Sequence, residues 1–244
     1  MGTAIFSVIK LAFFDVDGTL IHRNYSGSPS LKTRAFNFAT ENVFGLKGFD
    51  YAKILGRRIF GLTDRSIIKT ALSHLGMSKD DYHEKEDQLF LTIDKFFEEH
   101  MANEKNAGYS PVSGAIGFLV MLRSENIRLG LATGNIKKHA LWKLQICGFD
   151  NFFSTGGFGD DAELRTDILK AAIARNSDIA VNNICHFGDS LADLLAARDC
   201  GIKAVGLSNK GGGTHTREEL AETNYGLIID NWAEKTSIAN YLST

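Results

Sequence analysis

Two aspartates, Asp15 and Asp17, stand where an apolar segment ends in the sequence FFDVDGTL, residues 13–20. We expect residues 10–14 to form a buried strand, which puts both carboxylates at its carboxyl end, the edge at which open α/β sheets bind ligands. Side chains two residues apart in extended backbone share a face, and two carboxylates there need a cation or a shared proton to offset their repulsion. The alternative is a solvated Asp-Gly turn that closes a hairpin.

Two further predicted strands also end in polar residues. The segment LATGN ends a predicted strand at residues 127–133 with Thr133, and Gly134 and Asn135 begin the next helix. A hydroxyl and free backbone N–H groups at a helix start can hold an anion. The segment GDSLAD places Asp189 at another strand exit, with Asp193 four residues later on the same side of the following helix.

A cation is available between these two segments. Arg165 stands just before a predicted helix at residues 167–175, and Lys170 lies inside that helix. Acids, a hydroxyl and a fixed cation at one edge of a sheet are the groups that phosphoryl transfer needs.

The acids fit hydrolysis of a phosphate monoester in two steps. A nucleophilic carboxylate divides the reaction through an aspartyl-phosphate, and a second carboxylic acid protonates the leaving oxygen and later deprotonates the attacking water. Asp15 and Asp17 fit these two roles. We expect Mg²⁺ as cofactor because it binds carboxylate and phosphate oxygens and makes clustered acids tolerable. Asp189 is the natural further ligand, and Asp193 supports it.

The order of predicted elements favours an α/β fold with a helical insertion. From residue 109 onward strands, including a short one expected at residues 152–155, alternate with helices, which predicts a parallel sheet with helices on both faces. Residues 21–27 are polar and turn-rich. Residues 23–108 show helical apolar spacing, with helix starts expected at Ser30, at Thr63 or Asp64, and at Ser78. We therefore expect a core from residues 1–22 and 109–244 and an all-helical insertion at residues 23–108.

Composition and net charge limit which binding partners and which cellular compartment we expect. The 244 residues are 44% hydrophobic and 23% charged, with a formal net charge of −2 and a pI near 6.4, so no global basic field favours nucleic acid or an anionic membrane. No secretory signal pattern and no run of eighteen apolar residues is present. Three widely spaced cysteines suggest reduced thiols. We expect a soluble cytoplasmic protein, a monomer or a small homo-oligomer, that binds a small phosphorylated metabolite.

In its motifs and their order, the sequence resembles the haloacid dehalogenase superfamily, and within it the phosphatases similar to phosphoglycolate phosphatase and β-phosphoglucomutase. DVDGTL at residues 15–20 matches the first motif, Thr133 in LATGN the second, and GDSLAD at residues 188–193 the fourth. The resemblance implies a Rossmann-like core with a helical cap that closes over the substrate.

The resemblance also implies a role for each motif residue. Asp15 is the nucleophile and a Mg²⁺ ligand, Asp17 is the acid/base whose backbone carbonyl meets the metal, and Asp189 completes the metal site. The third motif usually has lysine and proline ahead of a helix, and Arg165 with Thr166 occupies that place here. Because of this position we assign the phosphate-binding cation to Arg165, with Lys170 as the alternative. An arginine there could bind phosphate through two hydrogen bonds at once.

Four further residues are candidates for recognising the leaving group. Arg57, Arg58 and Thr63 look like family positions on the substrate-facing side of the cap, and His22 follows the first motif closely enough to line the pocket. Two rival functions stay open: a phosphomutase, which uses the same core, and a non-catalytic phosphate-binding module, which would have no reason to keep both acids. A dehalogenase is disfavoured because a halide leaving group needs no acid.

Overall fold

Six parallel strands form the centre of the protein. The computed structural model describes residues 8–24, 29–104 and 108–243, and the strand order of its main sheet is β5-β4-β1-β6-β7-β8. Every neighbouring pair in this sheet is parallel, which confirms the predicted α/β fold. The strands are β1 (Leu11–Phe14), β4 (Arg128–Ala132), β5 (Thr155–Gly157), β6 (Ile184–Gly188), β7 (Lys203–Leu207) and β8 (Leu227–Ile229).

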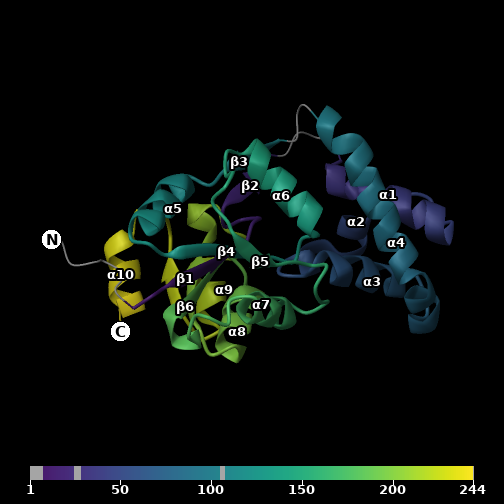
Figure 1. Cartoon of the computed structure of the whole chain (residues 1–244). Coiled ribbons are helices and arrows are strands. Elements are labelled where there is room, and N and C mark those ends of the chain that lie inside the picture. The colour runs from purple at the N-terminus through teal and green to yellow at the C-terminus, as the bar shows by residue number, and fades with distance from the viewer. Residues whose placement is uncertain (1–7, 25–28, 105–107, 244) are drawn as a thin grey trace.

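The central strand β1 shows why the sheet lies between two layers of helices. Ala12 and Phe14 belong to the apolar core on one face, and Leu11 and Phe13 belong to the core on the other. Because alternate side chains point to opposite faces, a strand that is apolar throughout must be covered on both. Figure 1 shows α5 above the sheet and α7 and α8 below it. The covering helices are α5 (Ala115–Ser124), α6 (Lys137–Ile146) and α10 (Lys235–Ser243) on one face, and α7 (Arg165–Ala174), α8 (Leu191–Asp199) and α9 (Arg217–Ala221) on the other.

The described residues between 29 and 104 form helices joined by short loops, on the right in Figure 1. They pack around a second apolar cluster, which also includes Ile136 and Trp142. Ser30, Thr63 and Ser78 cap three of these helices, each accepting a hydrogen bond from a backbone N–H, as predicted. None of the helices within the described ranges is both long and apolar enough to cross a membrane. The limits of the insertion, residues 23 and 108, stay a prediction. The helices are α1 (Leu31–Phe44), α2 (Tyr51–Leu55), α3 (Asp64–His74) and α4 (Lys79–His100), with 3-10 turns at Gly56–Ile59 and Met101–Asn103.

A two-stranded antiparallel ribbon joins the points where the chain leaves and re-enters the core. β2 (Ile21–Arg23) pairs with β3 (Tyr109–Pro111), with His22 opposite Ser110. The sequence predicted a turn-rich segment from residue 21, which is wrong for β2. A three-residue strand is too short to show a readable alternation, and its partner lies far along the chain.

Three elements begin at other residues than predicted. The helix α6 (Lys137–Ile146) was expected to be capped by Asn135, but the Asn135 side chain bonds to a carboxylate of the candidate site instead. β5 lies at Thr155–Gly157 rather than at 152–155, because the two phenylalanines before it pack against the apolar core. The helix α7 begins at Arg165, two residues earlier than expected, so this arginine is fixed in the first turn.

Candidate active site

The polar ends of three strands meet at one edge of the sheet. Asp15 follows β1, Thr133 follows β4 and Asp189 follows β6, and β1 lies between the other two strands. Parallel neighbours present their carboxyl ends at the same edge. Asp15, Asp189 and Asp193 each place an oxygen within 4.8 Å of the others, and all three are buried. The structure therefore brings the acids of the first and fourth motifs together.

Arg165 is the cation beside Asp15. Its Nη1 donates to Oδ1 of Asp15 at 2.8 Å, and its Nε lies 3.4 Å from Oδ1 of Asp193. Burial raises the pKa of Asp15 and Arg165 lowers it only in part, so the pKa stays above its ordinary value. The carboxylate of Asp15 is thus largely desolvated and held by a fixed guanidinium.

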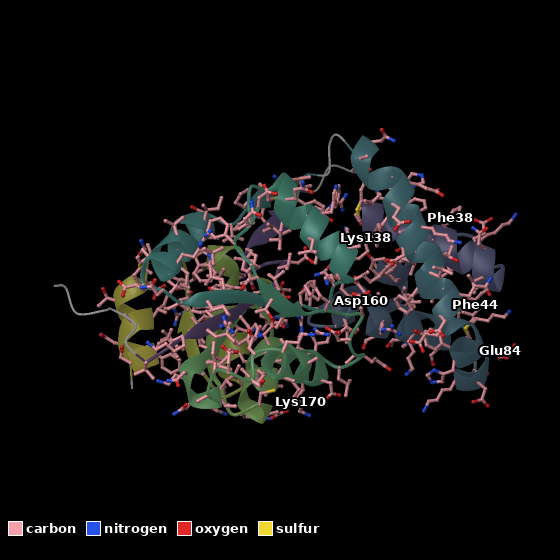
Figure 2. All side chains as sticks on the ribbon, viewed as in Figure 1. Phe38, Phe44, Glu84, Lys138, Asp160 and Lys170 are labelled. Atoms are coloured by element: carbon pink, nitrogen blue, oxygen red, sulfur yellow. The ribbon has the colours of Figure 1, made fainter. Side chains whose placement is uncertain are left out.

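Lys170, the alternative cation, lies away from these acids. Its side chain is 59% exposed and its Nζ lies 3.0 Å from Oδ1 of Asp167, one turn earlier on α7. Figure 2 shows Lys170 at the lower surface of the molecule. Arg165, only 9% exposed, lies at the strand edge beside Asp15, whereas Lys170 does not contact these acids.

Asp17 is held by a lysine that the motifs did not indicate. Nζ of Lys143, on α6, lies 2.7 and 2.5 Å from the two carboxylate oxygens of Asp17, and Nδ2 of Asn135 donates to Oδ2 at 2.8 Å. Burial raises the pKa of Asp17, but Lys143 and then Lys32 outweigh it, so the pKa falls well below its ordinary value. Asp17 is therefore an ionised carboxylate at neutral pH.

A signal for Lys143 is present in the sequence. Lys143 stands between Ala140 and Cys147 on one face of α6, and both of these neighbours are buried in the core. A lysine on an apolar helix face is rarely buried unless an acid pairs with it. Helical spacing thus indicates a buried pair, although it does not identify the acid.

Asp189 is fixed by neighbours on both sides. The backbone N–H of Thr214 donates to its Oδ2 at 2.7 Å, and the Thr19 hydroxyl donates to its Oδ1 at 3.3 Å. Gly18 has a φ of +82°, and a Cβ at that position would lie 2.1 Å from Oδ2 of Asp189, so the first motif requires glycine there. Burial and the nearby carboxylates of Asp15 and Asp193 raise the pKa of Asp189 well above its ordinary value.

Asp193 has most of its hydrogen-bonding capacity occupied. Its Oδ2 accepts from the backbone N–H and the hydroxyl of Ser190, at 3.1 and 2.6 Å, in the capping box that starts α8. Its Oδ1 lies 3.3 Å from Nε2 of His186. Burial raises the pKa of Asp193, but Arg165 and His186 lower it by more, so the pKa lies below its ordinary value. These contacts suit a group that orients its neighbours.

The three buried acids fit a hard divalent cation. The raised pKa values of Asp15 and Asp189 reflect the cost of holding several carboxylates out of water. A cation that prefers oxygen ligands offsets this cost. The side chain of Asp17 is not part of the cluster, since it is paired with Lys143. A contact between its backbone carbonyl and the metal stays a prediction.

The LATGN segment links the strand edge to the helical insertion. Thr133 is fully buried, and its Oγ1 accepts from the Asn135 backbone and side chain at 3.3 and 2.9 Å. The carbonyl of Gly134 accepts from the backbone N–H of Asp64 at 2.8 Å. A Cβ at Gly134 would lie 2.7 Å from Cα of Thr63, so glycine permits this close approach. The start of α3 therefore rests directly on the predicted phosphate-binding segment.

A cavity of about 690 Å³ opens over these groups. It reaches from the strand edge to α1, α2 and the turn before α3. Its walls include Asp15, Asp17, Gly134, Asn135, Lys143, Arg165 and Asp189 on one side and Lys32, Tyr51, Phe60 and Leu62 on the other.

The candidates for recognising the leaving group lie in different places. His22 lines the cavity, and its Nε2 is 3.1 Å from the Ser110 hydroxyl. Thr63 is buried beneath the cavity wall, where it caps α3 and donates to the carbonyl of Glu163 at 2.7 Å. The side chains of Arg57 and Arg58 lie outside the described part of the structure.

Comparisons with known proteins identify a family and similar folds. A family model described as haloacid dehalogenase-like hydrolase matches residues 9–201. No curated protein sequence matches the chain. Many solved structures match the chain. CbbY from Rhodobacter sphaeroides, in complex with phosphate, is 22% identical with a TM-score of 0.66, over 93% of this chain and 96% of that one.

Two further solved structures have similar scores. A predicted phosphoglycolate phosphatase from Haemophilus somnus is 20% identical with a TM-score of 0.64, over 94% of this chain and 97% of its own. A hydrolase from Pseudomonas syringae is 20% identical with a TM-score of 0.64, over 96% of this chain and 100% of its own. At these identities the likeness shows the fold.

Proposed function

Because the chain belongs to the haloacid dehalogenase-like hydrolases, we propose that it is a Mg²⁺-dependent phosphatase that hydrolyses a small phosphate monoester through an aspartyl-phosphate. The observation that carries this proposal is the contact of Arg165 with buried Asp15 at 2.8 Å, beside two further buried acids. The phosphate in the CbbY structure and the name of the Haemophilus relative support a phosphorylated substrate.

The chemistry assigned to Asp15 and Asp17 proceeds in two steps. An oxygen of Asp15 bonds to phosphorus as the bond to the leaving oxygen breaks, and that oxygen takes a proton from Asp17. Water then attacks phosphorus and gives a proton to Asp17, while the bond between phosphorus and Asp15 breaks. Since Asp17 is ionised in the protein alone, it must gain a proton when substrate binds.

Other groups hold the phosphate and balance its charge. Arg165, the Thr133 hydroxyl and the backbone N–H groups of the LATGN segment would bind phosphate oxygens. Asp15 and Asp189 would hold Mg²⁺, with Asp193 beside them, and the metal supplies a positive charge that stabilises the transferring phosphoryl group.

The helices of residues 23–108 would act as a cap. They form one wall of the cavity of about 690 Å³. Phe60, just after the 3-10 turn, lies against the core residue His215 with 6.0 Å between ring centroids. A cap in this position excludes bulk water and limits the substrate to a small molecule.

Phosphate release tests the proposal. Purified protein is assayed on p-nitrophenyl phosphate and a panel of phosphorylated metabolites, with Mg²⁺ and with a chelator. Asp15→Asn should lower kcat by about 10³-fold or more, because the nucleophile is lost. Asp178→Asn is the matched control, since Asp178 is 60% exposed and pairs only with Arg128 among the contacts described. Equal release by wild type and Asp15→Asn would contradict the assignment of the nucleophile.

A further inference from the structure

The two acids of the first motif are paired with different cations. Asp15 contacts Arg165, at the start of α7, whereas Asp17 contacts Lys143, near the end of α6. Asp15 is 5% exposed and shares the acidic cluster, while the Asp17 side chain is 44% exposed at the cavity. Two carboxylates only two residues apart are thus drawn to separate places.

All three donors of the Lys143 ammonium have an acceptor within reach. Two of these acceptors are the oxygens of Asp17, and the third is Oδ1 of Asn135 at 2.9 Å. Asn135 in turn donates from Nδ2 to Asp17 and to the Thr133 hydroxyl. The Tyr109 ring, with its centroid 5.5 Å from Nζ, lies beside the ammonium. A lysine that is 1% exposed is tolerated because this network is complete.

The same network limits where the Asp17 carboxylate can go. A free aspartate beside three buried acids and a divalent cation would be attracted to the cation, and added ligand charge tightens such sites. A carboxylate that bound the metal would no longer be available to the leaving oxygen. The bonds from Lys143 and Asn135 hold it in the cavity instead.

We propose that Lys143, together with Asn135, is a positioning residue that keeps the Asp17 carboxylate out of the cation site and reserves it for the leaving group. The exclusion from the cation site is argued from the contacts of Lys143 and Asn135 with Asp17. The consequence for the leaving group rests on the proposed phosphatase function.

Metal binding tests the exclusion without relying on catalysis. Isothermal titration calorimetry with Mg²⁺ compares wild type, Lys143→Met, Asp17→Asn and the double variant. Lys143→Met should tighten Mg²⁺ binding about tenfold, because the freed carboxylate adds a ligand, and the gain should vanish in the Asp17→Asn background. Lys137→Met removes an exposed lysine from the first turn of the same helix and should bind Mg²⁺ as wild type does.

Measuring the effect of Lys143→Met both with Asp17 and in the Asp17→Asn variant distinguishes the positioning role from a simple loss of positive charge. If Lys143→Met tightens Mg²⁺ binding equally with and without Asp17, only a positive charge has been lost and the positioning role is wrong. Unchanged affinity in Lys143→Met also overturns it. Should Lys143→Met fail to fold, Asn135→Ala can be used, because it removes one of the hydrogen bonds that hold Asp17. It should give a smaller increase in Mg²⁺ affinity, with the same dependence on Asp17.

The dependence of kcat on the leaving group tests the second half of the proposal, that Asp17 is reserved for the leaving oxygen. Lys143→Met should lower kcat about 10²-fold for an alkyl phosphate, which needs an acid, and much less for p-nitrophenyl phosphate, which does not. Lys143→Arg should restore part of the loss. Equal slowing of both substrates would refute the positioning role. If the wild type releases no phosphate from any substrate, the proposed function fails, while the calorimetric result still decides whether Lys143 excludes Asp17 from the cation site.

Discussion

Oδ1 of Asp15 lies 2.8 Å from Nη1 of Arg165, so the predicted nucleophile already contacts the cation that would receive the phosphate. Burial leaves the pKa of Asp15 raised, whereas Lys143 leaves the pKa of Asp17 lowered. The two neighbouring acids therefore lie in different electrostatic environments, one beside buried carboxylates and the other beside a buried lysine. The first acid belongs to the cluster of acids that could hold a metal, and the second lines the cavity.

Arg165→Ala should lower kcat/KM about 10²- to 10³-fold, because a desolvated donor to the transferring group is removed. Arg165→Lys should recover only part of the loss, since an ammonium cannot reproduce the two parallel bonds of a guanidinium. Steady-state kinetics on p-nitrophenyl phosphate measures both. Lys170→Ala, at an exposed position on the same helix, should match wild type. A loss in Lys170→Ala comparable to that in Arg165→Ala would return the assignment to Lys170.

Asp189 should make the metal-free protein less stable as pH rises. Its folded pKa is raised, so the folded state holds its proton more tightly than the unfolded chain, and this stabilisation is lost as pH rises from the ordinary aspartate range through the folded pKa. Asp189→Asn should therefore raise the Tm of metal-free protein at pH 7 and flatten this pH dependence.

Mg²⁺ should reverse the order of stability of these two proteins. At a concentration of 100 times Kd, the metal should stabilise wild type by about 2.7 kcal/mol, and Asp189→Asn should gain much less. Thermal unfolding with chelator and with Mg²⁺, between pH 5 and pH 8, gives both measurements. A lower Tm for metal-free Asp189→Asn than for wild type at pH 7 would show that the Asp189 carboxylate is not under electrostatic strain.

We expect Asp64 to stabilise the contact between the helical insertion and the candidate site. Its Oδ2 accepts from the backbone N–H of Ile136 at 3.0 Å, and its Oδ1 accepts from Nζ of Lys32 at 3.1 Å. Asp64→Ala leaves both donors without this partner and should cost about 2–3 kcal/mol of unfolding free energy. Glu98→Ala removes an exposed pair with Lys138 between α4 and α6, and should cost much less unfolding free energy than Asp64→Ala, because solvent screens such a pair. Urea unfolding compares the two, and equal costs would contradict the linking role of Asp64.

Sequence was sufficient where a motif follows a strand. Asp15, Thr133 and Asp189 could be placed together because parallel strands end at one edge, which requires no knowledge of distant contacts. Lys143 could not be assigned, because helical spacing indicates burial but not the partner, and Asp17 lies 126 residues away along the chain. The β2 strand was missed for the same reason, since within the described residues it pairs with β3, about 90 residues later in the chain. Interactions that depend on two distant segments meeting were thus the part that sequence patterns did not reveal.

Gly18→Ala should disrupt the metal site through one methyl group. Gly18 has a φ of +82°, and the added Cβ would meet Oδ2 of Asp189 at 2.1 Å, so either the loop or the carboxylate must move. Gly76→Ala is the matched control: its φ is +88°, and no atom lies within 4 Å of the added Cβ. Both variants should lose about 1–2 kcal/mol to the left-handed backbone. Only Gly18→Ala should also weaken Mg²⁺ binding, by about tenfold or more, because a ligand is displaced. Calorimetry with Mg²⁺ and urea unfolding separate the two effects, and wild-type Mg²⁺ affinity in Gly18→Ala would remove Asp189 from the proposed metal ligands.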